Sequence, residues 1–253
     1  MDRATGRRTS NADGSDLRVI VVCPMANEAA TAEAFVEAVL DAGSVFDDVR
    51  IFCVVDEMST DATRHILEQT ASRDSRVSVI WSPENRCISD AYLSGYRAAL
   101  KTGWPWILEI DAGFSHDPSD MTKFLKFMRQ NYDCIFGSRF CPGGSYTDSP
   151  WTRRAISRWG TSLTNWLLRT KLTDMTSGFQ AFQQNALRAI VEKGFAASGP
   201  FFQTEMKVSA NDMRVREVPI RYRLASRRVK LAEFFESLTI LWGLYRRRLS
   251  GSL

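Results

Sequence analysis

The stretch Trp106-Ile-Leu-Glu-Ile-Asp111-Ala-Gly-Phe-Ser-His-Asp-Pro118 decides how this chain can fold. Residues 106–110 are apolar and rich in β-branched and aromatic side chains, with Glu109 the only interruption, so they predict a buried strand. Asp111 and the small, turn-forming residues after it place a carboxylate at the carboxyl end of that strand. In an open parallel sheet ligands bind at this end, although an Asp in such a position can also simply cap the turn that follows.

Similar apolar runs occur on both sides of this stretch, and most are followed by a helical pattern. Strands are predicted at 17–23, 49–55, 77–81 and 133–137, and helices from Asn27 and Glu28, through Ile66 and Leu67, at 89–102 and at 121–130. Strands and helices alternate at the spacing of βαβ units. The predicted fold class is α/β and Rossmann-like, with a mostly parallel central sheet and helices on both faces.

Polar residues recur where the predicted strands end, so one edge of the sheet should collect them. They are Asn27, Glu28, Asp56, Asn85, Arg86, Asp111 and Arg139. No G-x-G-x-x-G follows the first strand and no G-x-x-x-x-G-K occurs. Neither a nicotinamide cofactor nor a Walker-type ATP site is therefore indicated.

The composition is that of a globular protein, with 44% hydrophobic and 25% charged residues among 253. Residues 1–16 are polar, lack the apolar core of a signal peptide, and are predicted to form a disordered tail. Residues 17–230 are predicted to form one domain, and 231–253 an amphipathic basic segment. The five scattered cysteines favour reduced thiols in the cytoplasm. No run approaches the roughly 18 apolar residues of a membrane span.

Eight motifs in a fixed order carry a family resemblance. They are Pro24-Met-Ala-Asn-Glu28, Val54-Val-Asp-Glu-Met-Ser-Thr-Asp61, Asn85-Arg86 with Ser89-Asp90-Ala91, the stretch from Glu109 to Pro118, Gly137-Ser-Arg139, Thr176-Ser-Gly-Phe-Gln-Ala181, Gln203-Thr-Glu205 and Glu217-Val-Pro-Ile220. In this order the chain resembles the inverting family 2 glycosyltransferases of the GT-A fold. Within that family it looks most like the dolichyl-phosphate mannose synthase and polyprenyl-phosphate glycosyltransferase branch.

The resemblance implies a nucleotide-sugar donor, a GDP- or UDP-sugar, and a divalent cation, Mg²⁺ or Mn²⁺. It implies donor binding by Pro24, Asn27, Glu28, Asp56, Ser59, Asn85, Arg86 and Asp90, a metal site at Asp111 and Ser115, and catalytic roles for Asp111 and Arg139. Structural alternatives stay open for several of these residues. Glu28 could be an ordinary carboxylate in the first turn of a helix, and Asp56, Ser59 and Asp61 could be a helix N-cap cluster.

One departure from the family pattern concerns the metal site. The central Asp-x-Asp motif reads Asp111-Ala112-Gly113 here, so one hard oxygen ligand and one negative charge are missing. Ser115, Asp117 or a water could take its place, or the metal could be loosely held. The alternative is a catalytically degenerate member that binds nucleotide sugars without turnover.

The acceptor implied by the resemblance is a polyprenyl or dolichyl monophosphate. Its phosphate is already ionised at pH 7, so no general base is needed. The predicted phosphate-binding residues are Arg139, Arg153, Arg154, Arg227 and Arg228, although each could instead belong to a solvated face. If the acceptor were a saccharide hydroxyl, a base would be needed, and Asp174 and Glu205 are the candidates.

The end of the chain is aromatic-rich and basic. Residues 231–245 form an amphipathic pattern that ends in Arg246, Arg247 and Arg248, as expected of a helix at a membrane interface. The alternative is a helix packed on the protein's own core. The sequence therefore predicts a peripheral enzyme on the cytoplasmic face of the membrane. A membrane partner protein is a further expected partner. No nucleic-acid partner is expected, because the chain carries no aromatic-basic RNA motif and no helix-turn-helix pattern.

Overall fold

The computed structural model describes residues 16–130, 132–147, 151–223 and 231–251, with the backbone alone at 231–233. The predicted tail at 1–16, except Asp16, lies outside the described residues, and so do Arg227 and Arg228.

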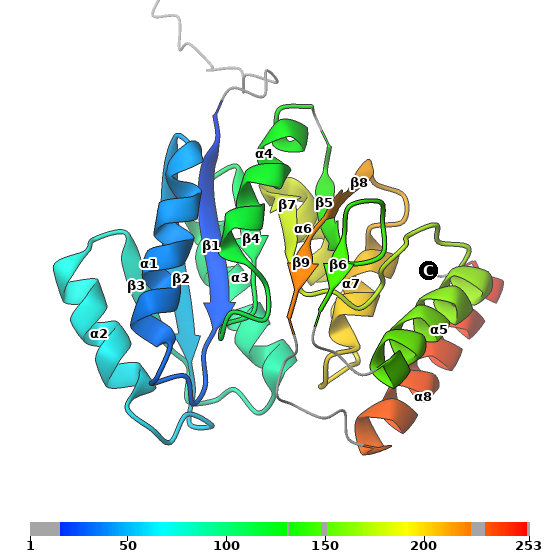
Figure 1. Cartoon of the computed structure of the whole chain (residues 1–253). Helices are drawn as coiled ribbons and strands as arrows, with labels where there is room; N and C mark the ends of the chain where they lie inside the picture. The colour runs from blue at the N-terminus through cyan, green and yellow to red at the C-terminus, as the bar shows by residue number, and fades with distance from the viewer. Residues whose placement is uncertain (1–15, 131, 148–150, 224–230, 252–253) are drawn as a thin grey trace, which may run out of the picture.

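A seven-stranded sheet forms the centre of the molecule (Figure 1). Its strand order is β3-β2-β1-β4-β7-β5-β8. All neighbouring pairs are parallel except those of β7, which runs antiparallel to both β4 and β5. The strands are β1 (Arg18–Pro24), β2 (Asp48–Val55), β3 (Val77–Trp81), β4 (Trp106–Glu109), β5 (Cys134–Ser138), β7 (Gln180–Gln183) and β8 (Val215–Pro219). The predicted mostly parallel sheet is confirmed.

Helices cover both faces of this sheet, as predicted. The first face packs around Phe35, Leu67 and Phe124, and the second around Tyr92, Leu187 and Phe202, all of which are buried. The helices of the first face are α1 (Ala32–Ala42), α2 (Thr63–Arg73) and α4 (Thr122–Met128), and those of the second are α3 (Ile88–Lys101), α6 (Gln184–Glu192) and α7 (Phe202–Ser209).

Some predicted boundaries are wrong for local physical reasons. Helix α1 begins at Ala32 rather than at Asn27, because Asn27 adopts a left-handed backbone with φ of 59° and its side chain bonds to a neighbouring loop. The helix predicted at 121–130 is the shorter α4, which follows a 3-10 turn at Pro118–Met121. A 3-10 turn at Gly43–Val45 follows α1.

A helix pair lies at one end of the sheet (Figure 1). It consists of α5 (Trp151–Leu168) and α8 (Leu231–Leu249), which share an apolar cluster containing Leu168, Leu241 and Leu244. Arg248 Nη1 donates a 2.6 Å hydrogen bond to the Leu167 carbonyl. A small second sheet pairs β6 (Ser145–Tyr146) with β9 (Arg221–Tyr222). Within the described residues, no helix has the length and apolar character needed to span a bilayer.

Candidate functional site

Asp111 lies two residues beyond the end of β4, at the carboxyl edge of the sheet, as the sequence predicts. Its side chain is 44% exposed. The Tyr92 hydroxyl of α3 donates a hydrogen bond to Asp111 Oδ1. His116 places Nε2 3.4 Å from Asp111 Oδ2. The carboxylate is thus held from two sides and still reaches solvent.

The surroundings of Asp111 favour its ionised form. Partial burial raises the pKa of a carboxyl, but the nearby His116 ring and the hydrogen bond from Tyr92 outweigh this and lower the pKa of Asp111. The positive charge of Arg139 acts in the same direction. Asp111 is consequently an anion across the physiological range, which suits a ligand for a cation.

Beneath Asp111 a buried polar network joins β4, β7 and α7. Gln180 Nε2 donates a 2.7 Å hydrogen bond to Glu109 Oε1 and another to Gln203 Oε1. Burial raises the pKa of Glu109 to about 8, although the Gln180 bond opposes this effect. A Cβ atom at Gly178 would lie 3.1 Å from Asp111 Oδ2 and 3.0 Å from Gln203 Nε2. A larger residue at this position would therefore crowd the side chains of Asp111 and Gln203.

Two of the predicted donor residues, Asn27 and Ser59, fasten two loops together. Asn27 Nδ2 donates to the Met58 carbonyl at 2.9 Å, and Asn27 Oδ1 accepts from the Thr60 amide at 3.0 Å. Ser59 Oγ accepts from the Asn27 amide at 3.1 Å. Asp61, just before α2, accepts from the Thr63 amide, but the N-cap residue of this helix is Ala62, so the alternative N-cap role is not confirmed. The loops after β1 and β2 are held as one wall.

The other predicted donor residues line the same edge. Asp56 is buried and its Oδ1 accepts from the Met58 amide at 3.0 Å. Asn85 accepts from Ser94 Oγ at 2.9 Å, and its buried Nδ2 has no hydrogen bond within the described residues. Arg86 Nε pairs with Asp90 Oδ2 at 3.2 Å, with most of the Arg86 side chain in solvent. Pro24 ends β1 beside them.

Glu28 and Ser115 approach the turn that carries Asp111. Glu28 Oε2 accepts a 2.9 Å hydrogen bond from Thr31 Oγ1, and the carboxylate lies against Gly113. Ser115 is buried in the same turn, and its carbonyl accepts from the Arg223 amide at 2.8 Å. Glu28 precedes α1 rather than lying in its first turn, so the alternative reading of it as an ordinary first-turn helix carboxylate is not supported.

Arg139 is not free to bind a phosphate as predicted. Its Nε and Nη2 atoms donate to the two carboxylate oxygens of Asp174 at 2.7 and 2.8 Å, and its amide donates to Asp174 Oδ2 at 3.1 Å. The side chain is 5% exposed. Its guanidinium lies over the rings of Tyr146 and Tyr222. Because its guanidinium is already paired with Asp174, Arg139 orders the aromatic wall beside Asp111.

Neither predicted base is available for that role. Burial alone would raise the pKa of Asp174, but Arg139 outweighs this and holds it far below its usual range, so Asp174 accepts no proton near neutrality. Glu205 is buried and accepts from the amides of Ala196 and Ala197, with Oε2 at 3.1 and 2.7 Å. Both carboxylates have structural roles.

Tyr222 of β9 lies between the Asp111 turn and β6. Its ring lies 5.0 Å from the His116 ring and 5.1 Å from the Tyr146 ring, centre to centre. Burial raises the pKa of Tyr222 and the charge of Asp111 adds to this, while the charges of Arg139 and Arg153 oppose it. The charge of Arg153 therefore reaches Tyr222, whereas Arg154 is an exposed residue of α5.

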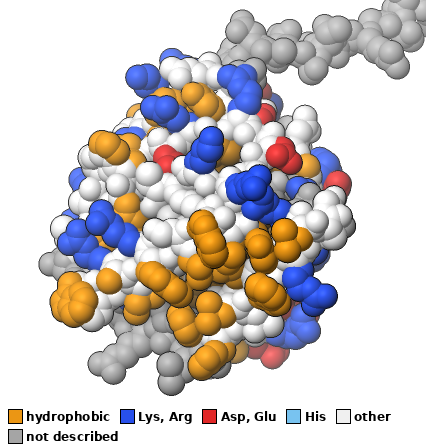
Figure 2. All heavy atoms as spheres, turned by 90° about the vertical axis from the view of Figure 1, so that its right-hand side faces the viewer, with side chains coloured by type: hydrophobic (Ala, Val, Ile, Leu, Met, Phe, Trp, Pro, Cys, Tyr) orange, Lys and Arg blue, Asp and Glu red, His pale blue; other side chains and the backbone are white. Residues whose placement is uncertain are grey.

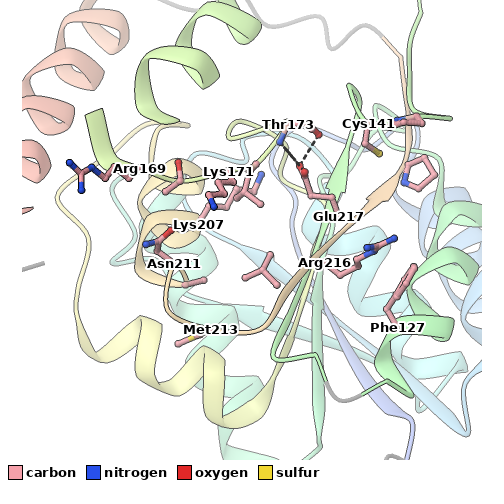
Figure 3. Close-up of a pocket in the computed structure, with 16 residues that line it drawn as sticks. Phe127, Cys141, Arg169, Lys171, Thr173, Lys207, Asn211, Met213, Arg216 and Glu217 are labelled. Carbon is pink, nitrogen blue, oxygen red and sulfur yellow. Dashed lines mark hydrogen bonds between the residues drawn. The ribbon is translucent and has the colours of Figure 1, made fainter. Parts of the chain in front are cut away.

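A groove of about 820 Å³ lies away from these residues, along the edge strand β8 (Figure 3). Arg169, Lys171 and Arg216 lie along it. Glu217 accepts from the amides of Thr173 and Asp174 across it, at 2.9 and 3.1 Å. Glu217 thereby fixes the loop that carries Asp174. None of the predicted donor or metal residues lines this groove.

Several residues that surround or support Asp111 were not identified from the sequence. Tyr92, His116, Gln180, Gln203 and Tyr222 surround Asp111 or support it. His116, Gln180 and Gln203 belong to the motifs quoted above, so the sequence did indicate that these residues could lie near the site. Tyr92 and Tyr222 carried none, because a tyrosine in an apolar helix or strand pattern is typical of a protein core.

Comparison with known proteins places this geometry in a family. The model of the family described as Glycosyl transferase family 2 matches residues 20–191, which include Asp111 and the loops after β1 and β2. The chain belongs to glycosyl transferase family 2. The family resemblance predicted from the sequence is confirmed.

Two curated relatives in this family are 31% identical to the chain. The undecaprenyl-phosphate mannosyltransferase of Micrococcus luteus aligns over 208 residues, which are 81% of this chain and 84% of that protein. The polyprenol monophosphomannose synthase of Mycolicibacterium smegmatis aligns over 172 residues, which are 67% of this chain and 65% of that protein.

Solved structures confirm the fold of this family 2 protein. Glucosyl-3-phosphoglycerate synthase from Mycobacterium tuberculosis, in complex with Mn²⁺, UDP and glucosyl-3-phosphoglycerate, superimposes with a TM-score of 0.63. Its sequence identity is 18%, and the match covers 93% of this chain and 81% of that one. The same enzyme with Mg²⁺ and UDP gives a TM-score of 0.61 at 18% identity, with 94% and 81% covered.

Proposed function

We propose that this protein transfers mannose from a nucleoside diphosphate donor to a polyprenyl phosphate, with inversion at the anomeric carbon. The observation that carries this proposal is the match to the Micrococcus luteus undecaprenyl-phosphate mannosyltransferase along 81% of the chain. The anionic, solvent-facing Asp111 at the carboxyl edge of the sheet supports it, since this edge is where α/β proteins bind nucleotides.

In the proposed reaction an oxygen of the acceptor phosphate forms a bond to the anomeric carbon. The bond between that carbon and the donor diphosphate breaks, and the nucleoside diphosphate leaves. The attacking oxygen is already ionised, so no general base is needed. The engagement of Asp174 and Glu205 in structural contacts supports a phosphate rather than a hydroxyl acceptor.

The residues at Asp111 fit a divalent cation that is shared with the donor. No cluster of three or more His, Cys, Asp or Glu side chains suited to a metal occurs in the described part of the chain. Mg²⁺ in nucleotide sites characteristically binds one or two carboxylates together with substrate phosphates. Asp111 and Ser115 would hold Mg²⁺ or Mn²⁺, which would offset the charge of the departing diphosphate.

The donor would lie across the wall made by the loops after β1, β2 and β3. In this proposal Asp56 accepts hydrogen bonds from base or ribose, and the unpartnered Asn85 Nδ2 is a further donor. Asn27 and Ser59 shape the wall rather than contact the nucleotide. Arg153, whose charge reaches Tyr222, is the best-placed described arginine for the acceptor phosphate.

The outer surface of α5 and α8 supports a peripheral membrane location on the cytoplasmic side. Trp166 is 76% exposed and Trp242 is 58% exposed. Trp159 and Trp166 are seven residues apart, so both project from one side of α5. Figure 2 shows apolar side chains gathered on this end of the molecule with Lys and Arg around them. Such a surface suits the headgroup region of an anionic bilayer, or a membrane partner protein.

The test is transfer of labelled mannose from GDP-mannose to a polyprenyl phosphate in detergent, with Mg²⁺, Mn²⁺ or EDTA. UDP-sugars serve as alternative donors, and an oligosaccharide serves as the hydroxyl acceptor. We expect metal-dependent, lipid-linked product that Asp111→Asn abolishes. Product on the oligosaccharide alone would overturn the acceptor assignment. Nucleotide binding without turnover across all donors would indicate a degenerate member.

A further inference from the structure

Gly113 stands where the family motif has its second Asp, and its surroundings are unusual. Its backbone has φ of 76°, a conformation that side chains rarely adopt. A Cβ atom built on Gly113 would lie 3.0 Å from Glu28 Oε2 and 3.1 Å from Glu28 Oε1. A carboxylate from the loop after β1 thus already lies against the position from which the missing Asp would project.

Glu28 is fixed in this place by its own loop. Its amide donates a 2.7 Å hydrogen bond to Thr63 Oγ1, and its carbonyl accepts from the Thr31 and Ala32 amides at 2.9 and 2.8 Å. Thr31 Oγ1 donates to Glu28 Oε2 at 2.9 Å. Within the described residues Glu28 Oε1 accepts no hydrogen bond, which leaves it available to a ligand.

A second feature of the site points to a ligand at Asp111. His116 is 1% exposed, and neither ring nitrogen has a hydrogen bond within the described residues. Its Nε2 is nevertheless directed at Asp111 Oδ2. Asp111 and Glu28 both lie near the same buried thiol, Cys23. Burial chiefly raises the pKa of this thiol, and the nearby Cys53 and then the charges of Asp111 and Glu28 add to the effect. The two carboxylates therefore border one region.

We propose that the carboxylate of Glu28 replaces the second carboxylate of the Asp-x-Asp motif as a ligand for the divalent cation. The inference rests on the proposed function and names a ligand pair, Glu28 and Asp111, that restores two negative charges. The exchange is electrostatically coupled, because an aspartate introduced at Gly113 would bring two negative carboxylates to the same place. The glycine at this position and Glu28 form a matched pair.

The experiment measures Mn²⁺ binding by electron paramagnetic resonance, with and without GDP or UDP, and needs no turnover. The variants are Glu28→Gln, Gly113→Asp and the double variant, with Glu37→Gln as a matched control. Glu37 is an exposed residue of α1, so its variant loses the same charge away from the site. Circular dichroism verifies that each variant is folded.

We expect Glu28→Gln to weaken Mn²⁺ binding in the presence of nucleotide at least tenfold, and Glu37→Gln to leave it unchanged. The double variant should regain much of the loss, since the introduced aspartate then supplies the carboxylate. Wild-type affinity in Glu28→Gln would overturn the inference alone. If Glu28→Gln weakened nucleotide binding equally in the absence of metal, and Gly113→Asp did not restore the binding, Glu28 would instead bind the base or ribose. Absence of Mn²⁺ binding by the wild type with either nucleotide would overturn both the inference and the proposed donor site.

Discussion

Tyr92 of α3 and Asp111 beyond β4 are joined by a hydrogen bond from the phenol to Oδ1. The phenol is buried against the second face of the sheet, and the carboxylate faces solvent at its edge. A residue of the core thus sets the orientation of the residue that the proposed reaction depends on. The burial of Tyr92 and the charge of Asp111 raise the pKa of the phenol, so it remains a donor at any physiological pH.

Removing this hydroxyl should impair transfer more than folding. We expect Tyr92→Phe to lower the transfer rate about tenfold, because Asp111 loses one of its two supports, and to change the unfolding free energy by about 1 kcal/mol. Tyr96→Phe is the matched control, since the buried Tyr96 hydroxyl contacts only the Met206 sulfur, at 3.5 Å, within the described residues. Initial rates and urea denaturation measure the two effects. Equal rates in both variants would refute a role for the Tyr92 bond.

Breaking the buried pair of Arg139 and Asp174 should destabilise the whole domain. Asp174→Asn leaves the guanidinium of Arg139 buried without its counter-charge, which typically costs about 3 to 5 kcal/mol. The exposed pair of Arg64 and Glu68 gives the comparison, and Arg64→Gln should cost less than about 1 kcal/mol. Urea unfolding curves provide both values. A cost for Asp174→Asn as small as that for Arg64→Gln would mean that Arg139 finds another partner or reaches water.

The sequence was sufficient to predict five of the seven strands of the main sheet, because these five read as largely apolar runs. The two strands that it missed are β7 and β8. The strands predicted at 17–23, 49–55, 77–81 and 133–137 all occur within one residue of the prediction. The antiparallel β7 was not predicted as a strand, because its sequence, Gln-Ala-Phe-Gln, is short and half polar. Gln180 of this strand bonds to Glu109 and Gln203, and only the assembled sheet supplies those partners.

The candidate site was predictable in position but not in the roles of its residues. Polar residues at strand ends must meet at one edge, so Asp56, Asn85 and Asp111 were placed correctly. Whether an arginine there binds a ligand or a neighbouring carboxylate depends on what folds beside it. Arg139 meets Asp174, which lies 35 residues further along the chain. A pattern of neighbouring residues in the sequence cannot predict a pairing between residues so far apart in the chain.

Exposed tryptophans of the helix pair should govern binding to lipid vesicles. We expect Trp166→Ser and Trp242→Ser each to weaken binding to anionic vesicles about tenfold, because each removes an aromatic ring from the proposed interface. Trp81→Ser is the control, since Trp81 packs against Arg64 on the far side of the sheet. Sedimentation with vesicles measures the effect. Unchanged binding in the two helix variants would exclude this surface as the membrane contact.

Two helical glycines should respond to alanine in opposite directions. A Cβ atom at Gly95 of α3 would collide with Val22 of β1 and would lie 2.9 Å from Val54 Cγ2. Gly95→Ala should therefore lower the unfolding free energy by about 1 to 3 kcal/mol. A Cβ at Gly160 of α5 meets nothing within 4 Å, so Gly160→Ala should raise it by up to about 1 kcal/mol. Thermal unfolding distinguishes them, and destabilisation by both would contradict the open surroundings of Gly160.

The buried Lys207 should make stability depend on pH above neutrality. Its Nζ donates to the carbonyls of Asp174 and Ser177 at 2.9 and 2.8 Å, and burial lowers its pKa to about 8 from an ordinary 10.5. Between these values the unfolded chain binds more protons than the folded one. The unfolding free energy must then rise with pH across this window, by up to about 3 kcal/mol.

Lys207→Met removes this titration, and its lost hydrogen bonds lower stability equally at every pH. The difference between wild type and Lys207→Met should thus be constant below pH 8 and grow toward pH 10.5. Lys171→Met, at an exposed lysine of the same groove (Figure 3), should give a difference independent of pH. Urea unfolding at half-unit intervals tests this. A constant difference for Lys207→Met would show that the buried ammonium keeps its proton, stabilised by the two carbonyls and by Asp174.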